Sequence, residues 1–257
     1  MLVLLSPAKR LDGERPPVTD RYSQPRLLEQ AQQLAQAGAR LTPAQFQGLT
    51  GVSDRLADLN VQRFKAFSPP FDLNNARQAI FLFRGDVYQG LDADNLDEDA
   101  LAFAQEHLRI LSGLYGVLRP LDLIQPYRLE MGTRFQVNGA GSLYDFWGGQ
   151  ITDLLEQDLN GAAALVNLAS NEYFKAVDEK RLTTRLITPV FTELRNGKPT
   201  QISFFAKKAR GLMARFILVN RIEDPEGLKA FDDEGYRFRA DLSQGHRWMF
   251  TRPDSRA

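Results

Sequence analysis

The chain has 257 residues, with 32 Lys and Arg balanced by 32 Asp and Glu, 43% hydrophobic residues and no cysteine. The length fits one large domain or two small ones, and the composition argues against a disordered, collagenous or coiled-coil chain. With no repeat and no linker in the sequence, we expect a single domain over residues 1–257. Without cysteine there is no disulfide, thiolate zinc site or cysteine nucleophile, and two histidines are too few for a multi-histidine metal site. We therefore expect no metal and no cofactor.

Short apolar segments predict strands, and segments with apolar residues at helical spacing predict helices. The predicted strands are residues 1–5, 79–83, 165–168, 186–191, 202–205 and 247–251. The predicted helices are residues 26–37, a helix that begins after Asp97, and residues 144–155 and 206–220. Gly and Pro residues make 11–25 an extended loop and 112–134 a long irregular segment of the kind that is usually functional. The order of elements predicts a mixed α/β fold, with a mixed β-sheet surrounded by helices.

The first residues and the hydropathy of the chain bear on its location. The apolar start at residues 1–5 lacks a basic leader and meets Pro7 and Lys9 too early for a signal peptide. No apolar run approaches the roughly 18 residues that a membrane span needs. We expect a cytoplasmic protein with no membrane partner.

Charges are segregated along the sequence although they cancel overall. Residues 92–99 carry five acids and no base, and residues 195–221 carry seven bases and no acid. The acids fit the start of a helix capped by Asp97, and a carboxylate cation site is the alternative. A local basic face is sufficient for nucleic-acid binding in a chain of zero net charge.

Residues 42–66 resemble a helix-hairpin-helix element. Thr42 and Gln45 have the spacing of a capping box at the start of a short helix. Gly51 then begins a tight turn, and Ser53 stands where such hairpins usually have a second glycine. In this type of element, backbone N–H groups at the start of the second helix bind a DNA phosphate.

Two bases accompany this predicted hairpin. Arg55 lies in the first turn of the second helix, and Arg63 lies two turns further along. We predict that Gly51, Ser53, Arg55 and Arg63 contact DNA phosphates. The alternative is that the segment is two short helices of the core, with Ser53 and Asp54 forming an ordinary helix start.

A second predicted phosphate site lies on the helix at 206–220. Lys207, Lys208 and Arg210 stand within four residues with no acid close by in the sequence, so they repel one another unless an anion is present. A solvated basic face is the alternative. Gly211 within this helix permits another backbone or a ligand to approach closely.

Polar residues also follow three predicted strands, where ligands gather in open α/β sheets. Lys9 follows the first strand, Asp86 and Tyr88 follow the second, and Lys175 comes after residues 165–168. We add Lys9 and Lys175 to the predicted phosphate-binding residues, and name Lys9 and Asp86 as catalytic candidates. The enzyme hypothesis takes a nucleic acid or an anionic, phosphorylated small molecule as substrate; surface residues without a ligand are the alternative.

Six segments in order resemble the YaaA family of bacterial peroxide-stress-resistance proteins. The segments are LSPAK at 5–9, GDVY at 85–88, LSGLYGVLRPLDLIQPYRLEMG at 111–132, LYDFWG at 143–148, NLASNEYFK at 167–175 and KKARGLMARF at 207–216. The resemblance extends from Met1 to about Gly235 and implies a cytoplasmic protein that protects DNA against iron-dependent peroxide damage. It also implies a helix-hairpin-helix element at Gly51 to Arg55, a basic cleft that suits DNA, and no accepted catalytic reaction.

Overall fold

The computed structural model describes residues 1–254 and confirms a mixed α/β fold built on a central β-sheet. The strands of this sheet are β1 (Leu2–Leu5), β5 (Leu108–Ser112), β6 (Gly116–Leu118), β8 (Leu165–Asn167), β9 (Leu186–Arg195), β10 (Lys198–Thr200), β11 (Arg237–Phe238) and β12 (Arg247–Pro253). Two small ribbons pair β2 (Arg10–Leu11) with β4 (Phe83–Arg84), and β3 (Arg77–Gln78) with β7 (Leu123–Ile124).

Parallel strands form the middle of the central sheet, whose order is β11-β12-β9-β8-β1-β5-β6. The pairs β12–β9, β9–β8, β8–β1 and β1–β5 are parallel, and the outer pairs with β6, β10 and β11 are antiparallel. Strand β1 therefore lies between β5 and β8, and the chain leaves β1 and β8 at the same edge. In α/β sheets, ligands bind outside this carboxyl edge.

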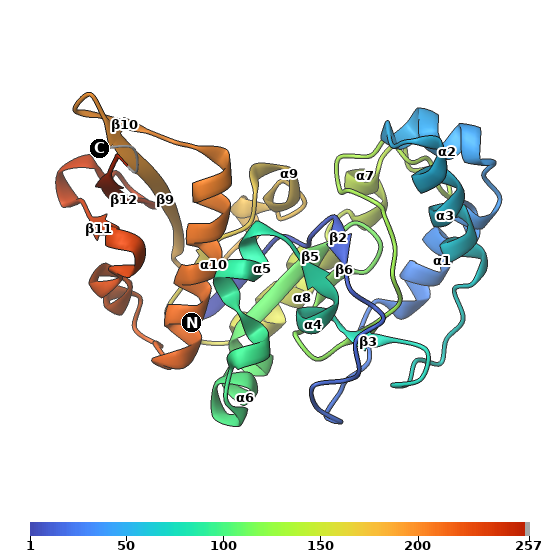
Figure 1. The fold of residues 1–257 in the computed structure, drawn as a ribbon, viewed down its shortest axis with the longest axis horizontal. Coiled ribbons are helices and arrows are strands. Elements are labelled where there is room, and N and C mark those ends of the chain that lie inside the picture. Colours follow the sequence, from blue (N-terminus) through green and yellow to red (C-terminus); the bar gives the residue numbers. More distant parts are fainter. Residues whose placement is uncertain (255–257) are drawn as a thin grey trace.

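Helices surround the sheet. They are α1 (Leu28–Ala39), α2 (Pro43–Thr50), α3 (Asp54–Lys65), α4 (Ala79–Leu82), α5 (Asp86–Leu91), α6 (Glu98–His107), α7 (Leu143–Trp147), α8 (Gln150–Leu159), α9 (Asn171–Phe174) and α10 (Ser203–Val219). Short 3-10 helices are Ala93–Asn95, Glu179–Arg181, Pro225–Ala230, Asp233–Gly235 and Ala240–Leu242. Figure 1 shows α1, α2 and α3 gathered at one end of the long axis, and β9 to β12 at the other.

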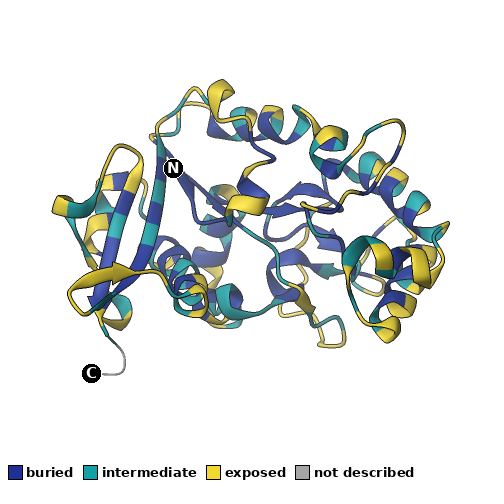
Figure 2. Cartoon of the chain, turned by 90° about the horizontal axis from the view of Figure 1, so that it is seen from above, coloured by how far each residue is buried: buried dark blue, intermediate teal, exposed yellow. Residues whose placement is uncertain are grey.

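The core follows the parallel strands. Leu4, Ile110 and Val166 are each 0% exposed, and Figure 2 shows the central strands buried and the outer helix faces exposed. Strands buried on both faces are apolar along their whole length, which is why the sequence marks β1 and β8 clearly. Among residues 1–254, no helix combines the length and the apolar character that crossing a membrane requires.

Helices α5 and α10 cross with their backbones in contact. A Cβ atom on Gly211 would lie 1.8 Å from the carbonyl oxygen of Val87, and one on Gly90 would lie 2.2 Å from the carbonyl oxygen of Lys208. Only glycine fits at either position. The predicted close approach at Gly211 is therefore confirmed, and another backbone makes it.

Two predicted strands are helical in the structure. Residues 79–82 form α4, and only Phe83 and Arg84 continue as strand β4. Residues 203–205 are the first turn of α10, which begins after Ile202. Both segments are short apolar runs, and in such runs burial alone does not distinguish a strand from a buried helix. The predicted helix at 144–155 is broken into α7 and α8 at Gly148, whose φ is 47°.

Two predicted helix starts are confirmed in detail. Thr42 accepts a hydrogen bond from the backbone N–H of Gln45, whose side chain accepts one from the N–H of Thr42, completing the capping box. Asp97 caps α6 by accepting a hydrogen bond from the N–H of Ala100 at 2.7 Å. The acidic run therefore contains the helix start that its sequence predicts.

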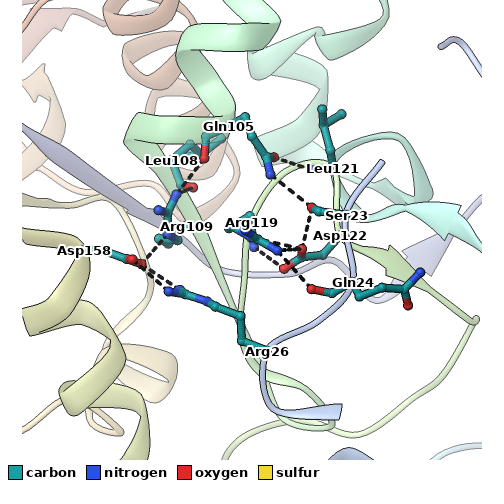
Figure 3. A network of polar contacts seen from close by, with 10 residues as sticks. All are labelled: Ser23, Gln24, Arg26, Gln105, Leu108, Arg109, Arg119, Leu121, Asp122 and Asp158. Carbon is teal, nitrogen blue, oxygen red and sulfur yellow. Dashed lines mark hydrogen bonds and ion pairs between the residues drawn. The ribbon is translucent and has the colours of Figure 1, made fainter. Parts of the chain in front are cut away.

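Partly buried ion pairs fix the segment before α1 against the sheet (Figure 3). Asp158 accepts hydrogen bonds from Arg26 at 2.7 and 2.8 Å and from Arg109 at 2.6 Å. Close by, the fully buried Asp122 accepts bonds from Ser23 and Arg119. These pairs tie together chain segments that are distant in sequence.

Candidate functional site

A cavity of about 420 Å³ opens beyond the carboxyl ends of β1 and β8, and we call it the strand-end cavity. Its ionisable lining residues are Lys9, Arg10, Arg84, Asp86, Tyr88, Tyr127, Arg128, Glu130, Glu172, Tyr173, Lys207 and Arg210. Six of these are Lys or Arg and three are Asp or Glu, so cations outnumber acids at this edge of the sheet. The position agrees with the general rule for ligand sites in α/β sheets.

The loops after β1 and β8 are joined at the edge of the cavity. The backbone N–H of Ser170 donates a hydrogen bond to Oγ of Ser6 at 2.8 Å, and the two hydroxyl oxygens lie 3.3 Å apart. The hydroxyl of Tyr88 donates to the carbonyl oxygen of Ser6 at 3.1 Å. These bonds hold Lys9, Asp86 and the start of α9 around one space.

Helix α10 supplies one wall of the cavity through Lys207 and Arg210. Within residues 1–254, neither side chain has a hydrogen bond or an ion pair. Burial lowers the pKa of the Arg210 guanidinium, and no nearby acid offsets this effect. A half-buried cation without a compensating acid is an electrostatic environment that an anion would stabilise.

Most other bases of the run at 195–221 have acidic partners elsewhere in the chain. Nζ of Lys208 lies 2.5 Å from Glu234. The further pairs are Arg195–Glu193 at 3.0 Å, Arg215–Asp92 at 3.5 Å and Arg221–Asp99 at 2.8 Å. Lys208 is therefore neutralised outside the strand-end cavity, whereas its neighbour Lys207 lies within it.

The structure brings together some of the predicted strand-end residues. Lys9 is 71% exposed, and its Nζ lies 4.0 Å from a carboxylate oxygen of Glu130. Asp86 is half-buried in the first turn of α5 and has no ion pair within residues 1–254. Lys9, Asp86 and Tyr88 of the strand-end prediction line the cavity together with Lys207 and Arg210 of the basic helix.

Lys175 lies elsewhere. It is exposed at the end of α9, does not line the cavity, and its Nζ lies 5.0 Å from the centre of the Tyr144 ring. The hydroxyl of Tyr144 in turn donates to the carbonyl oxygen of Glu172 at 2.8 Å. Helix α9 turns the chain within four residues, so its Glu172 and Tyr173 face the cavity and Lys175 does not.

The long irregular segment contributes cavity residues that the sequence argument did not name. Tyr127, Arg128 and Glu130 line the cavity, and the Arg128 guanidinium pairs with the Glu130 carboxylate. The hydroxyl of Tyr127 lies 2.6 Å from Oγ of Ser112 at the end of β5. The sequence predicted that this irregular segment is functional, but it did not indicate which of its residues line a site.

Helices α2 and α3 are joined by a short turn at residues 51–53, the place where the sequence suggests a hairpin. Gly51 ends α2 in the left-handed conformation with φ 66°, and Ser53 precedes α3 without capping it through its side chain. Arg55 is exposed, whereas burial lowers the pKa of Arg63, which donates to Asn60 at 3.3 Å. Figure 1 shows this helix pair at one end of the molecule, away from α10.

The acidic run is largely paired. Asp94 pairs with Arg15 and Arg84, Asp99 pairs with Arg221, and Asp97 caps α6. In the described part of the chain, no group of three or more His, Asp or Glu side chains could hold a metal ion.

The fold and the strand-end cavity define a mixed α/β protein whose parallel strands end at a cavity rich in cationic side chains. A family model described as peroxide stress protein YaaA matches residues 1–242, and the chain belongs to this family. A UPF0246 protein of Hahella chejuensis (strain KCTC 2396) is 53% identical over 254 residues, which are 98% of this chain and 99% of that protein. The resemblance drawn from six sequence segments is confirmed.

Proposed function

We propose that this protein binds DNA in the cytoplasm without sequence selectivity, and thereby protects it against iron-dependent oxidative damage. Lys207 and Arg210 in the strand-end cavity carry the proposal, because they are cations without acidic partners in the described chain. Lys9 extends the same basic surface toward solvent. Phosphate contacts of this kind position DNA without reading its sequence.

The α2–turn–α3 pair would provide a second phosphate contact. The N-terminus of the 12-residue α3 has no side-chain cap from Ser53, so its first N–H groups are available to an anion. Arg55 is exposed beside them and Arg63 lies two turns further along α3. Asp54 opposes an anion in the first turn, and we therefore expect this contact to be weaker than the one at the cavity.

The test is fluorescence anisotropy of a labelled duplex at several salt concentrations. We expect the Lys207→Ala, Arg210→Ala double variant to lose at least about tenfold in affinity, and its salt slope to fall by about two. Lys198→Ala removes an exposed base of the same run outside the cavity and is the matched control. Equal affinities of the double variant and the wild type would reject the cavity as the DNA contact.

Membership of a peroxide stress family supports the protective part of the proposal. A strain lacking the gene would be complemented with the wild type, the double variant or Lys198→Ala and exposed to hydrogen peroxide. We expect the double variant alone to fail. Full protection by a variant that no longer binds DNA would separate the stress role from DNA binding.

An enzyme acting on a nucleic acid or a phosphorylated small molecule is the second candidate. It is favoured by the half-buried carboxylate of Asp86, which shares a cavity with Lys9 and could move a proton beside a bound phosphate. Product formation from nucleic acids and nucleotides would be measured by chromatography, with Asp86→Asn as the control. Turnover that Asp86→Asn leaves intact would exclude this carboxylate.

A further inference from the structure

The size of the strand-end cavity exceeds what phosphate binding alone requires. Phosphates of a duplex lie on its outside, and surface side chains reach them without any hollow in the protein. The cavity holds about 420 Å³, which falls in the range of pockets that enclose most of a small molecule. A ligand that fills it must therefore bring more than a phosphate group.

The walls differ in chemistry in a way that fits a nucleotide. Lys207 and Arg210 form a cationic side suited to a phosphate. Tyr127 and Tyr173, residues that are 6% and 8% exposed, line the cavity, and Leu168 adds an apolar surface. Aromatic and apolar walls take up a planar base, as they do in proteins that receive extruded bases.

Acceptors for a base are present as well. The carboxylate of Glu172 accepts a hydrogen bond from the backbone N–H of Gly132 at 3.1 Å, which leaves further acceptor capacity on its oxygens. Asp86 supplies a second carboxylate on the side of α5. Carboxylates of this kind accept hydrogen bonds from the amino groups of bases.

The cavity is also held rigid before any ligand arrives. The bonds between Ser6 and Ser170 fix the two loops, and the backbone contact at Gly211 fixes α10 against α5. A preformed pocket lowers the cost of ordering the protein around a ligand.

We infer that the strand-end cavity takes up one whole nucleotide, with its phosphate against Lys207 and Arg210 and its base against the tyrosine side. The inference rests on the proposed function, because it takes this nucleotide to be one that is extruded from duplex DNA. A free mononucleotide has the same chemistry and is the other source that the test distinguishes.

The first arm compares two duplexes of equal length and charge, one fully paired and one with a single mismatched nucleotide. Extruding a mismatched nucleotide costs less than extruding a paired one, so we expect the mismatched duplex to bind about tenfold more tightly or better. Equal affinities of the wild type for the two duplexes would overturn the inference that the nucleotide is extruded from DNA.

The second arm fills the cavity without altering its charges. Ala8 lines the cavity beside Lys9, and we expect Ala8→Trp to bring the affinity ratio of the two duplexes to about one. Val18→Trp adds the same ring at a site that is 53% exposed and outside the cavity, so its ratio should equal that of the wild type. Thermal unfolding of each variant verifies its fold, and a preference that survives in folded Ala8→Trp would overturn the cavity as the site.

The third arm titrates the wild-type protein with deoxyadenosine monophosphate and, separately, with inorganic phosphate. Saturable binding of the mononucleotide that is lost in Arg210→Ala, with no duplex bound at low salt, would refute the proposed function and retain the nucleotide site. Duplex binding with neither a mismatch preference nor mononucleotide binding would retain the proposed function and refute the nucleotide site. Equal affinity for phosphate and mononucleotide would show that no base is recognised and would also overturn the inference.

Discussion

The crossing of α5 and α10 gives the sharpest prediction about stability, through Gly211→Ala. The new Cβ would lie 1.8 Å from the carbonyl oxygen of Val87 and 2.7 Å from the backbone nitrogen of Leu91, whereas ordinary contact begins at 3.4 Å. Both atoms belong to a helix backbone, so no rotamer change relieves the overlap and the helices must separate.

Overpacking of this kind costs about 3 kcal/mol at the upper end of its usual range. Alanine returns about 1 kcal/mol of helix propensity relative to glycine. We therefore expect Gly211→Ala to lower the free energy of unfolding by at least about 2 kcal/mol, which corresponds to a melting temperature lower by about 4–8 °C in a protein of this size.

The assay is thermal and urea unfolding followed by circular dichroism, with Gly48→Ala as the matched control. Gly48 lies in α2, and a Cβ there meets nothing within 4 Å, so the same substitution should stabilise the protein by up to about 1 kcal/mol. The helix movement should also weaken DNA binding, because α10 carries Lys207 and Arg210. A Gly211→Ala protein that is as stable as the wild type would refute the backbone contact.

Three further predictions concern ion pairs and the hairpin. Burial raises the pKa of Asp158, but hydrogen bonds from Arg26 and Arg109 outweigh this effect and lower the pKa overall. The ionised Asp158 therefore stabilises the fold above the unfolded pKa of about 4, and this stabilisation is lost as the pH falls through the folded pKa. Urea unfolding of Asp158→Asn should show a loss of about 2 kcal/mol at pH 7 and a smaller loss at pH 3. Arg252→Met removes the guanidinium that donates to the 1% exposed Glu193 at 2.8 Å, while Arg195 still pairs with this carboxylate at 3.0 Å. Its urea unfolding should therefore show a loss of about 2 kcal/mol, whereas Arg239→Met, whose partner Asp241 is 60% exposed, should change little. In the anisotropy assay Arg55→Ala should reduce the salt slope by about one and Lys65→Ala at the other end of α3 should not; equal slopes would exclude the hairpin contact.

The sequence predicted strands β1 and β8 and the helix starts because these depend on local chemistry. Apolar runs define β1 and β8, and the capping patterns at Thr42 and Asp97 are satisfied within four residues of chain. The segments at 79–82 and 203–205 were assigned wrongly to strands because a short apolar run is compatible with both elements. In these segments tertiary packing decides the structure.

The sequence predicted only some of the residues that line the strand-end cavity. Lys9 follows β1, so the strand-end rule finds it. Asp86 was placed there by a predicted strand at 79–83, which is α4 and the short ribbon strand β4 in the structure. Arg128 and Glu130 line the same cavity but belong to an irregular segment whose hydrophobic residues follow no helical or strand periodicity. Gly113 is what brings that segment close: a Cβ there would lie 2.2 Å from the carbonyl oxygen of Leu129. The contact between Gly113 and Leu129 depends on the tertiary fold, so the local sequence pattern does not predict it.

The structure shows that the acidic run at 92–99 and the basic run at 195–221 lie close enough to form ion pairs with each other. Two bases of the basic run pair with the acidic run, through Arg215–Asp92 and Arg221–Asp99. These ion pairs join the two runs, and two of the four bases on α10, Lys208 and Arg215, have acidic partners. The charge that remains at Lys207 and Arg210 lies in the strand-end cavity. Arg195, Lys208, Arg215 and Arg221 of the basic run have acidic partners, and Lys198 lies outside the cavity. Within this run the attraction for an anion is therefore concentrated where Lys207 and Arg210 share the cavity.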